Sequence, residues 1–135
     1  MISLDLARRI QDSGVPWTPG DGDRFWVPDR DLDDVVFVVS HMVVEVRDVP
    51  TGRLLAFNGT TEWALDSILQ REAVWLPRED QLREMLGEHF RALTATPGGY
   101  VVVMDGPGGE ERHIDIDAEC AYARAVLSLR RGLLP

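Results

Sequence analysis

Closely spaced aspartates in the stretch GDGDRFWVPDRDLDD have the residue type and spacing of a hard-cation site. Calcium is bound by several converging carboxylate oxygens, and Asp29, Asp31 and Asp33 alternate as the first ligands of a calcium loop do. An EF-hand loop then needs glycine where Asp34 stands and a bidentate glutamate where Ser40 stands. We therefore expect an acidic, solvated connection before a buried strand, with a cation site at the three alternating aspartates as the alternative.

A second set of metal-ligand types lies in the sequence HIDID. In a strand, alternate residues share a face, so His113, Asp115 and Asp117 would lie on one face, and Ile114 and Ile116 on the other. Iron and zinc sites use the spacing of a histidine and an aspartate two residues apart. A strand with one solvated face, followed by an aspartate that caps a helix, explains the same residues without a metal. We expect no cofactor, and His113 and Asp115 stay metal candidates.

Residue types suited to nucleophilic catalysis are poorly placed in this sequence. Ser40 and His41 are neighbours, so in a strand they point to opposite faces and form no direct pair. Cys120 lies on an apolar helix face, where a thiol is usually inert. All 14 cationic residues are arginine, which excludes a lysine-containing phosphate loop, a Schiff base and a lysine general base. These features favour a protein without enzymatic activity.

The stretch FNGTTEWALDS predicts a turn followed by a capped helix over residues 60–70. At about 100° per residue, Trp63 projects nearly opposite to the apolar stripe of that helix. A tryptophan off the core stripe is either covered by a second layer or exposed at a contact surface. The predicted binding surface consists of Asn58, Glu62, Trp63, Asp66, Ser67 and Gln70.

Hydrophobic periodicity and turn signals predict the elements that position these residues. Helices are expected at residues 3–13, 60–70 and 78–90, and from Asp117 onward, where a wide apolar stripe predicts cover on more than half of the helix. Strands are expected at residues 24–28, 35–39, 42–49 and 54–58, and in a second meander at 90–95, 99–105 and 111–115. We predict an α+β fold in which antiparallel meanders pack against three or four helices, as one two-layer domain over residues 1–135.

Composition limits the classes of partner. The net charge of −9 and the isoelectric point near 4.7 argue against nucleic acid, whose binding depends on cationic contacts to phosphates. One cysteine forms no internal disulfide, and no run approaches the roughly 18 apolar residues that span a bilayer. The start of the chain does not have the pattern of a signal peptide. We expect a cytoplasmic protein with no membrane partner.

Three segments, WTPGDGDRFWVPDRDLDD, FNGTTEWALDS and WLPREDQLREMLG, together resemble an uncharacterised family of small actinobacterial proteins, and the resemblance spans nearly the whole chain. Some members are labelled pilus assembly protein CpaE, which implies an ATPase with a glycine-rich nucleotide loop. This chain has neither that loop nor a lysine, so no site residue is carried over. The second half is also loosely similar to short bacterial and phage-associated proteins of unknown function.

These observations favour a non-enzymatic protein-binding or adaptor domain, with an immunity-like or phage-related protein as one subtype. Its expected partner is another protein or a second copy of the chain in a homodimer. One alternative is a small metal-dependent hydrolase that uses the acids or HIDID. The other is a small-molecule binding module with an aromatic lining of Trp17, Trp26, Trp63 and Trp75.

Overall fold

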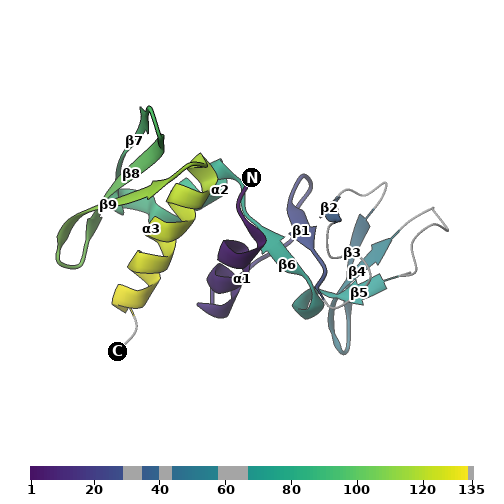
Figure 1. The fold of residues 1–135 in the computed structure, drawn as a ribbon. Helices are drawn as coiled ribbons and strands as arrows, with labels where there is room; N and C mark the ends of the chain where they lie inside the picture. The colour runs from purple at the N-terminus through teal and green to yellow at the C-terminus, as the bar shows by residue number, and fades with distance from the viewer. Residues whose placement is uncertain (29–34, 40–43, 58–66, 134–135) are drawn as a thin grey trace. The chain divides into compact units, whose positions relative to one another are not determined.

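The computed structural model describes residues 1–28, 35–39, 44–57 and 67–133 (Figure 1). Their strands form antiparallel three-stranded sheets that accompany α-helices, so the predicted α+β class is confirmed. The chain divides into two compact units, residues 1–16 with 77–135 (unit 1) and residues 17–76 (unit 2). One domain over residues 1–135 stays a prediction.

Unit 1 combines three α-helices with one antiparallel sheet (Figure 1). Its elements are α1 (Leu4–Asp12), α2 (Glu79–Leu86), the 3-10 turn η2 (Gly87–His89), β7 (Phe90–Thr96), β8 (Gly99–Gly106), β9 (Gly109–Asp115) and α3 (Ala118–Leu133). The strand order is β7-β8-β9. Helix α3 packs against β8 and β9 and also contacts α1 and α2, so it is the central element of this unit.

The apolar pattern of α3 explains its central position. Of the predicted stripe residues, Ala121, Tyr122, Ala125, Val126 and Leu129 are buried, and Ala118 is partly buried. Three further apolar residues, Cys120, Ala123 and Leu127, are buried as well, which confirms the cover expected over more than half of the helix. A helix with so wide an apolar face has to contact several neighbours at once.

Capping residues fix where two helices of unit 1 begin. The Ser3 side chain accepts a hydrogen bond from the amide of Leu6 at 3.2 Å, as expected of the N-cap of α1. Asp117 precedes α3, and its Oδ1 accepts a hydrogen bond from the Cys120 amide at 3.0 Å. Both predicted caps are confirmed. The predicted helix over residues 78–90 is shorter than expected, because α2 ends at Leu86 and Phe90 already begins β7.

The described residues of unit 2 form two small antiparallel sheets. In the first, β1 (Arg24–Trp26) lies between β2 (Val36–Val38) and β6 (Val74–Leu76). In the second, β4 (Gly52–Phe57) lies between β3 (Val44–Val49) and β5 (Ser67–Leu69), and the 3-10 turn η1 (Gln70–Glu72) follows β5. One cluster of buried apolar residues among the described residues of this unit comprises Phe25, Val27, Phe37, Val39, Leu55 and Ala73.

The predicted helix over residues 60–70 is wrong where the structure describes that segment. Ser67–Leu69 forms strand β5, antiparallel to β4, with Ile68 opposite Leu55 and Leu69 opposite Leu54. Hydrogen-bonded pairing with a neighbouring strand has overridden a helical pattern that was only local, because a short helix is marginal without packing. The other residues of that prediction lie outside the described part of the chain.

Candidate functional site

Most of the predicted binding surface lies outside the described residues, namely Asn58, Glu62, Trp63 and Asp66. Ser67 and Gln70 are described, but they do not lie on a helix face. Ser67 begins β5, and the Gln70 side chain donates a hydrogen bond to the carbonyl oxygen of Trp17 at 2.6 Å. Gln70 therefore ties two segments of unit 2 together, and the surface around Trp63 stays a prediction.

The metal candidates are in two different situations. Asp29, Asp31 and Asp33 lie outside the described residues. His113 and Asp115 lie on β9 opposite Val102 and Tyr100 of β8, so they share a face as predicted. No group of three or more histidine, cysteine, aspartate or glutamate side chains that suits a metal ion occurs in the described part of the chain.

The polar face of β9 is the covered one, so the expected solvated face is wrong. The His113 and Asp115 side chains are only 18% and 15% exposed, whereas Ile114 and Ile116 are 65% and 83% exposed. Helix α3 compensates the covered polar groups, because Arg124 Nε donates to Asp115 Oδ2 at 2.9 Å. A polar group that is buried without a hydrogen-bond partner destabilises the fold, and a helix that supplies such a partner removes this cost.

Ser128, Glu111 and His113 have the residue types of a catalytic triad but a different arrangement. Ser128 Oγ donates to Glu111 Oε1 at 2.5 Å, and His113 Nε2 lies 2.9 Å from the same oxygen. A triad places the imidazole between hydroxyl and carboxylate, so that it takes the hydroxyl proton. Here the carboxylate is in the middle. Hydrogen bonds from Ser128 and His113, with the nearby Arg131 charge, lower the pKa of Glu111 despite some desolvation.

Cys120 is the other potential nucleophile, and its surroundings make it unreactive. The side chain is buried, and burial is the main cause that raises the pKa of its thiol. Nearby Asp117 and Asp115 raise it further, because negative charge disfavours the thiolate. The thiolate is the reactive form, so burial and the two nearby acids disfavour reaction at this cysteine.

The four tryptophans do not share one face. Trp17 stacks on Trp75, with ring centroids 6.0 Å apart and an angle of 6° between the planes. Trp75 is paired with Phe25 in the sheet, and Trp26 is the next residue along β1, so it points to the opposite face. Trp63 lies outside the described residues. A single aromatic pocket that includes both Trp26 and Trp75 is therefore excluded.

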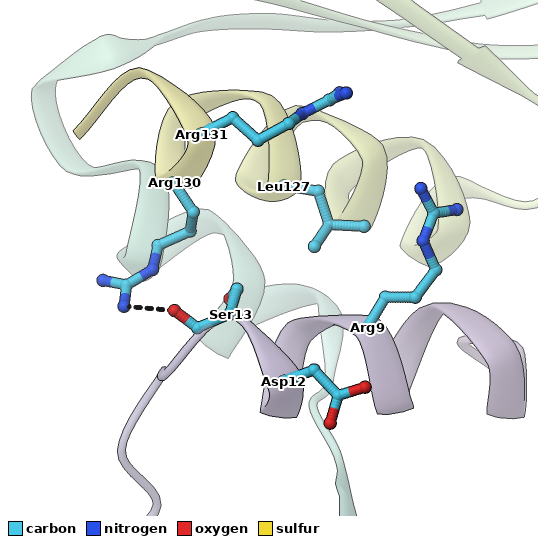
Figure 2. Close-up of a pocket in the computed structure, with 6 residues that line it drawn as sticks. All are labelled: Arg9, Asp12, Ser13, Leu127, Arg130 and Arg131. Carbon is cyan, nitrogen blue, oxygen red and sulfur yellow. Dashed lines mark hydrogen bonds between the residues drawn. The ribbon is translucent and has the colours of Figure 1, made fainter. Parts of the chain in front are cut away.

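An open groove lies between α1 and α3 in unit 1, and we call it the arginine groove. It has a volume of about 290 Å³ and is lined by Arg9, Asp12, Ser13, Leu127, Arg130 and Arg131 (Figure 2). An adjoining hollow of about 150 Å³ is lined by Leu6, Arg9, His113, Arg124, Leu127 and Arg131. The two hollows share Arg9, Leu127 and Arg131, so they form one continuous surface.

The folding of the two helices positions this groove. Leu6, Ala7 and Ile10 are the buried face of α1, so Arg9 stands at the border of that face. Figure 2 shows Leu127 extending from α3 toward α1 and Arg9 extending from α1 toward α3. Arg130 joins the helix ends, because its NH2 group donates to the carbonyl oxygen of Ser13 at 2.9 Å.

The arginines of the groove and of the adjoining hollow differ in the groups that bind their guanidiniums. Arg124 is paired with Asp115 at 2.9 Å, and Arg130 is bound to the Ser13 carbonyl. Arg9 has only Asp5, at 3.9 Å, and both side chains are more than half exposed. Arg131 makes no ion pair or hydrogen bond within the described chain, although it lies close enough to Glu111 to lower the pKa of that carboxyl. Two cationic groups, one on each helix, are therefore available to a ligand.

Sequence reasoning missed the arginine groove. The signal was present as two arginine pairs, Arg8 with Arg9 and Arg130 with Arg131, each near the C-terminus of an amphipathic helix. Cations there are ordinarily explained by the negative end of the helix dipole. No local sequence pattern indicates that α1 and α3, which are far apart in the sequence, lie side by side.

The chain matches no protein-family model, no curated protein and no solved structure in the three comparisons. The resemblance to the actinobacterial family thus stays a prediction. In the part of the chain that the structure describes, no helix combines the length and apolar character needed to cross a membrane. The class that the fold defines is an α+β protein, and the arginine groove is one of its described surface hollows.

Proposed function

We propose that this chain is a non-enzymatic, cytoplasmic protein-binding or adaptor domain whose partner places an acidic segment in the arginine groove. One observation carries the proposal: Arg9 and Arg131 stand on two helices around the same open hollow, and Arg131 makes no ion pair or hydrogen bond within the described chain. Guanidinium groups bind carboxylates with two parallel hydrogen bonds, which gives both affinity and orientation.

A protein partner fits this surface better than a nucleic acid. A duplex or a long single strand extends well beyond one groove, and the net charge of −9 on the whole chain would repel its other phosphates. A short acidic segment contacts the groove alone. The partner is another protein or a second copy of the chain, and an immunity-like or phage-related adaptor is the subtype that we propose.

The arrangement of two potential nucleophiles in the described part of the chain supports the non-enzymatic part of the proposal. Among the described residues, Ser128 has a carboxylate instead of an imidazole as its neighbour, and the Cys120 thiol is buried. The hydrolase alternative rested on the acids and on HIDID. His113 lies within hydrogen-bond distance of Glu111 on the same strand, and Asp115 accepts a hydrogen bond from Arg124 of α3, so both side chains already have polar partners.

Charge reversal in the groove tests the proposal. Affinity-tagged wild type, Arg131→Glu and Arg112→Glu are used to capture partners from a native lysate of the source organism, with quantification by mass spectrometry. Arg112 is the matched control, because it is exposed and precedes His113 on β9, so it points to the opposite face of the sheet. We expect a partner that both wild type and the control retain and that Arg131→Glu loses. Partner sets that are the same for all three proteins would refute the groove as the binding surface.

A further inference from the structure

The arginine groove has an apolar floor beneath a cationic rim. Leu127 lines the groove and Leu6 lines the adjoining hollow. They are 8% and 4% exposed, so each presents only a small edge. The alkyl stems of Arg9 and Arg130 extend this apolar area, since long cationic side chains cover apolar surface and keep their charged heads in water. A simple anion would use the rim and leave the floor in contact with water.

We propose that the groove recognises an acidic peptide segment that carries an apolar side chain between its carboxylates. This inference rests on the proposed function and names the ligand of the same site. The apolar side chain lies on Leu127, between the two helices, while one carboxylate pairs with Arg9 and another with Arg131. The peptide is thus held across the groove by both helices.

The distribution of partners around the arginines supports two carboxylate contacts. Arg124 is paired with Asp115 and Arg130 with the Ser13 carbonyl, so these two guanidiniums already have acceptors. Arg9 and Arg131 extend from different helices, and a ligand that reaches both has to separate its negative groups. Asp12 also lines the groove and is its one acid among the lining residues, so it opposes any anion placed near the end of α1.

Labelled peptides measured by fluorescence anisotropy test this inference directly. The first peptide is Gly-Asp-Asp-Leu-Asp-Asp-Gly, the second has Ser in place of Leu, and the third has Lys in place of every Asp. We expect the Leu peptide to bind about tenfold more tightly than the Ser peptide, because partial burial of one leucine contributes an effect of that size. The Lys peptide should not bind. Raising the ionic strength to about 1 M should strongly weaken binding of the Leu peptide, because the Debye length then falls to about 3 Å and the charges are screened.

Matched variants assign the contacts to residues. Arg9→Gln and Arg131→Gln should each lower the affinity for the Leu peptide about tenfold, which is the scale of one charge-assisted hydrogen bond. Arg112→Gln removes the same charge on the opposite face of β9 and should leave binding unchanged. Arg9 and Arg131 are both exposed, so their substitution leaves the core intact, and an unchanged circular dichroism spectrum verifies this.

The outcomes separate this inference from the proposed function. Equal affinities for the Leu and Ser peptides would overturn the apolar contact, even if lysate capture still depends on Arg131. Inorganic phosphate that displaces the Leu peptide at the same concentration as free Asp-Asp-Leu-Asp-Asp would also overturn it, because a simple anion site would then be sufficient. If lysate capture does not depend on Arg131 while the Leu peptide binds as expected, the partner assignment fails and the peptide site stands.

Discussion

Asp117 makes two separable contributions to the stability of unit 1, and Asp117→Ala removes both. Its Oδ1 accepts the amide of Cys120 at 3.0 Å, which satisfies one of the free N–H groups at the start of α3. Its Oδ2 lies 3.1 Å from the amino group of Met1. These contacts attach the first segment of the chain to the central helix of the unit.

The size of the effect follows from the exposure of each contact. Replacing an aspartate N-cap by alanine costs about 0.5–2 kcal/mol, with about 1 kcal/mol as the usual value. The ion pair with Met1 adds less than about 1 kcal/mol, because exposed pairs are screened by water. Its two partners are 41% and 36% exposed. We expect Asp117→Ala to lower the free energy of unfolding by about 1–2 kcal/mol.

The assay has to report on the correct unit. The α-helices of the described chain, α1, α2 and α3, lie in unit 1, so circular dichroism at 222 nm during urea unfolding follows that unit. All four tryptophans, at positions 17, 26, 63 and 75, lie within residues 17–76, so their fluorescence follows unit 2. The urea midpoint of the dichroism signal should therefore fall in Asp117→Ala.

A second variant distinguishes the two contributions. Asp117→Ser keeps a side-chain acceptor for the Cys120 amide but removes the negative charge, so it should lose less than about 1 kcal/mol. Equal losses in the Ala and Ser variants would show that the cap contributes little. If the urea midpoint of Asp117→Ala equals that of wild type, neither contact of Asp117 stabilises unit 1.

Two further predictions use the same unfolding measurements. The pKa of Glu111 is lowered in the folded protein, so its contribution to stability is present above its ordinary pKa of about 4.3 and is lost as pH falls through the folded value. Wild type should then lose more stability than Glu111→Gln between about pH 5 and pH 3, and equal losses would contradict this sign. If the chain is one domain, the dichroism and tryptophan transitions of wild type should coincide in urea, whereas separate midpoints would show two independently unfolding units.

The elements with strong local signals were predictable from the sequence. Helix α3 has a wide apolar stripe and an aspartate cap, and the turns TPGG and GPGG mark the hairpins of β7, β8 and β9. Strand β5 was not predictable in this way. Its three residues continue a helical pattern, and only pairing with β4, a segment outside the local window, decides their conformation.

The candidate site was harder to predict, because it depends on which distant segments meet. His113 and Asp115 share a face as the period of a strand requires, but the sequence does not say that α3 covers that face. Arg124 and Ser128 on α3 form hydrogen bonds with Asp115 and Glu111 of β9, so the face that was predicted to be solvated is covered by the helix. Arg9 and Arg131 come from opposite ends of the chain, so no local window contains both.

The arginine groove also shows why net charge is a poor guide to the sign of a ligand. A charge of −9 argued against anionic partners, but screening at physiological ionic strength limits each charge to a range of about 8 Å. Within that range a ligand in the groove meets Arg9 and Arg131, while Asp115 is neutralised by Arg124. Asp12 lines the groove, Asp5 lies 3.9 Å from Arg9, and Glu111 lies near Arg131, so these acids offset part of the local positive charge. Acids farther from the groove repel large polyanions more than short ones. An acidic chain with a local arginine pair is therefore suited to select short acidic segments over nucleic acid.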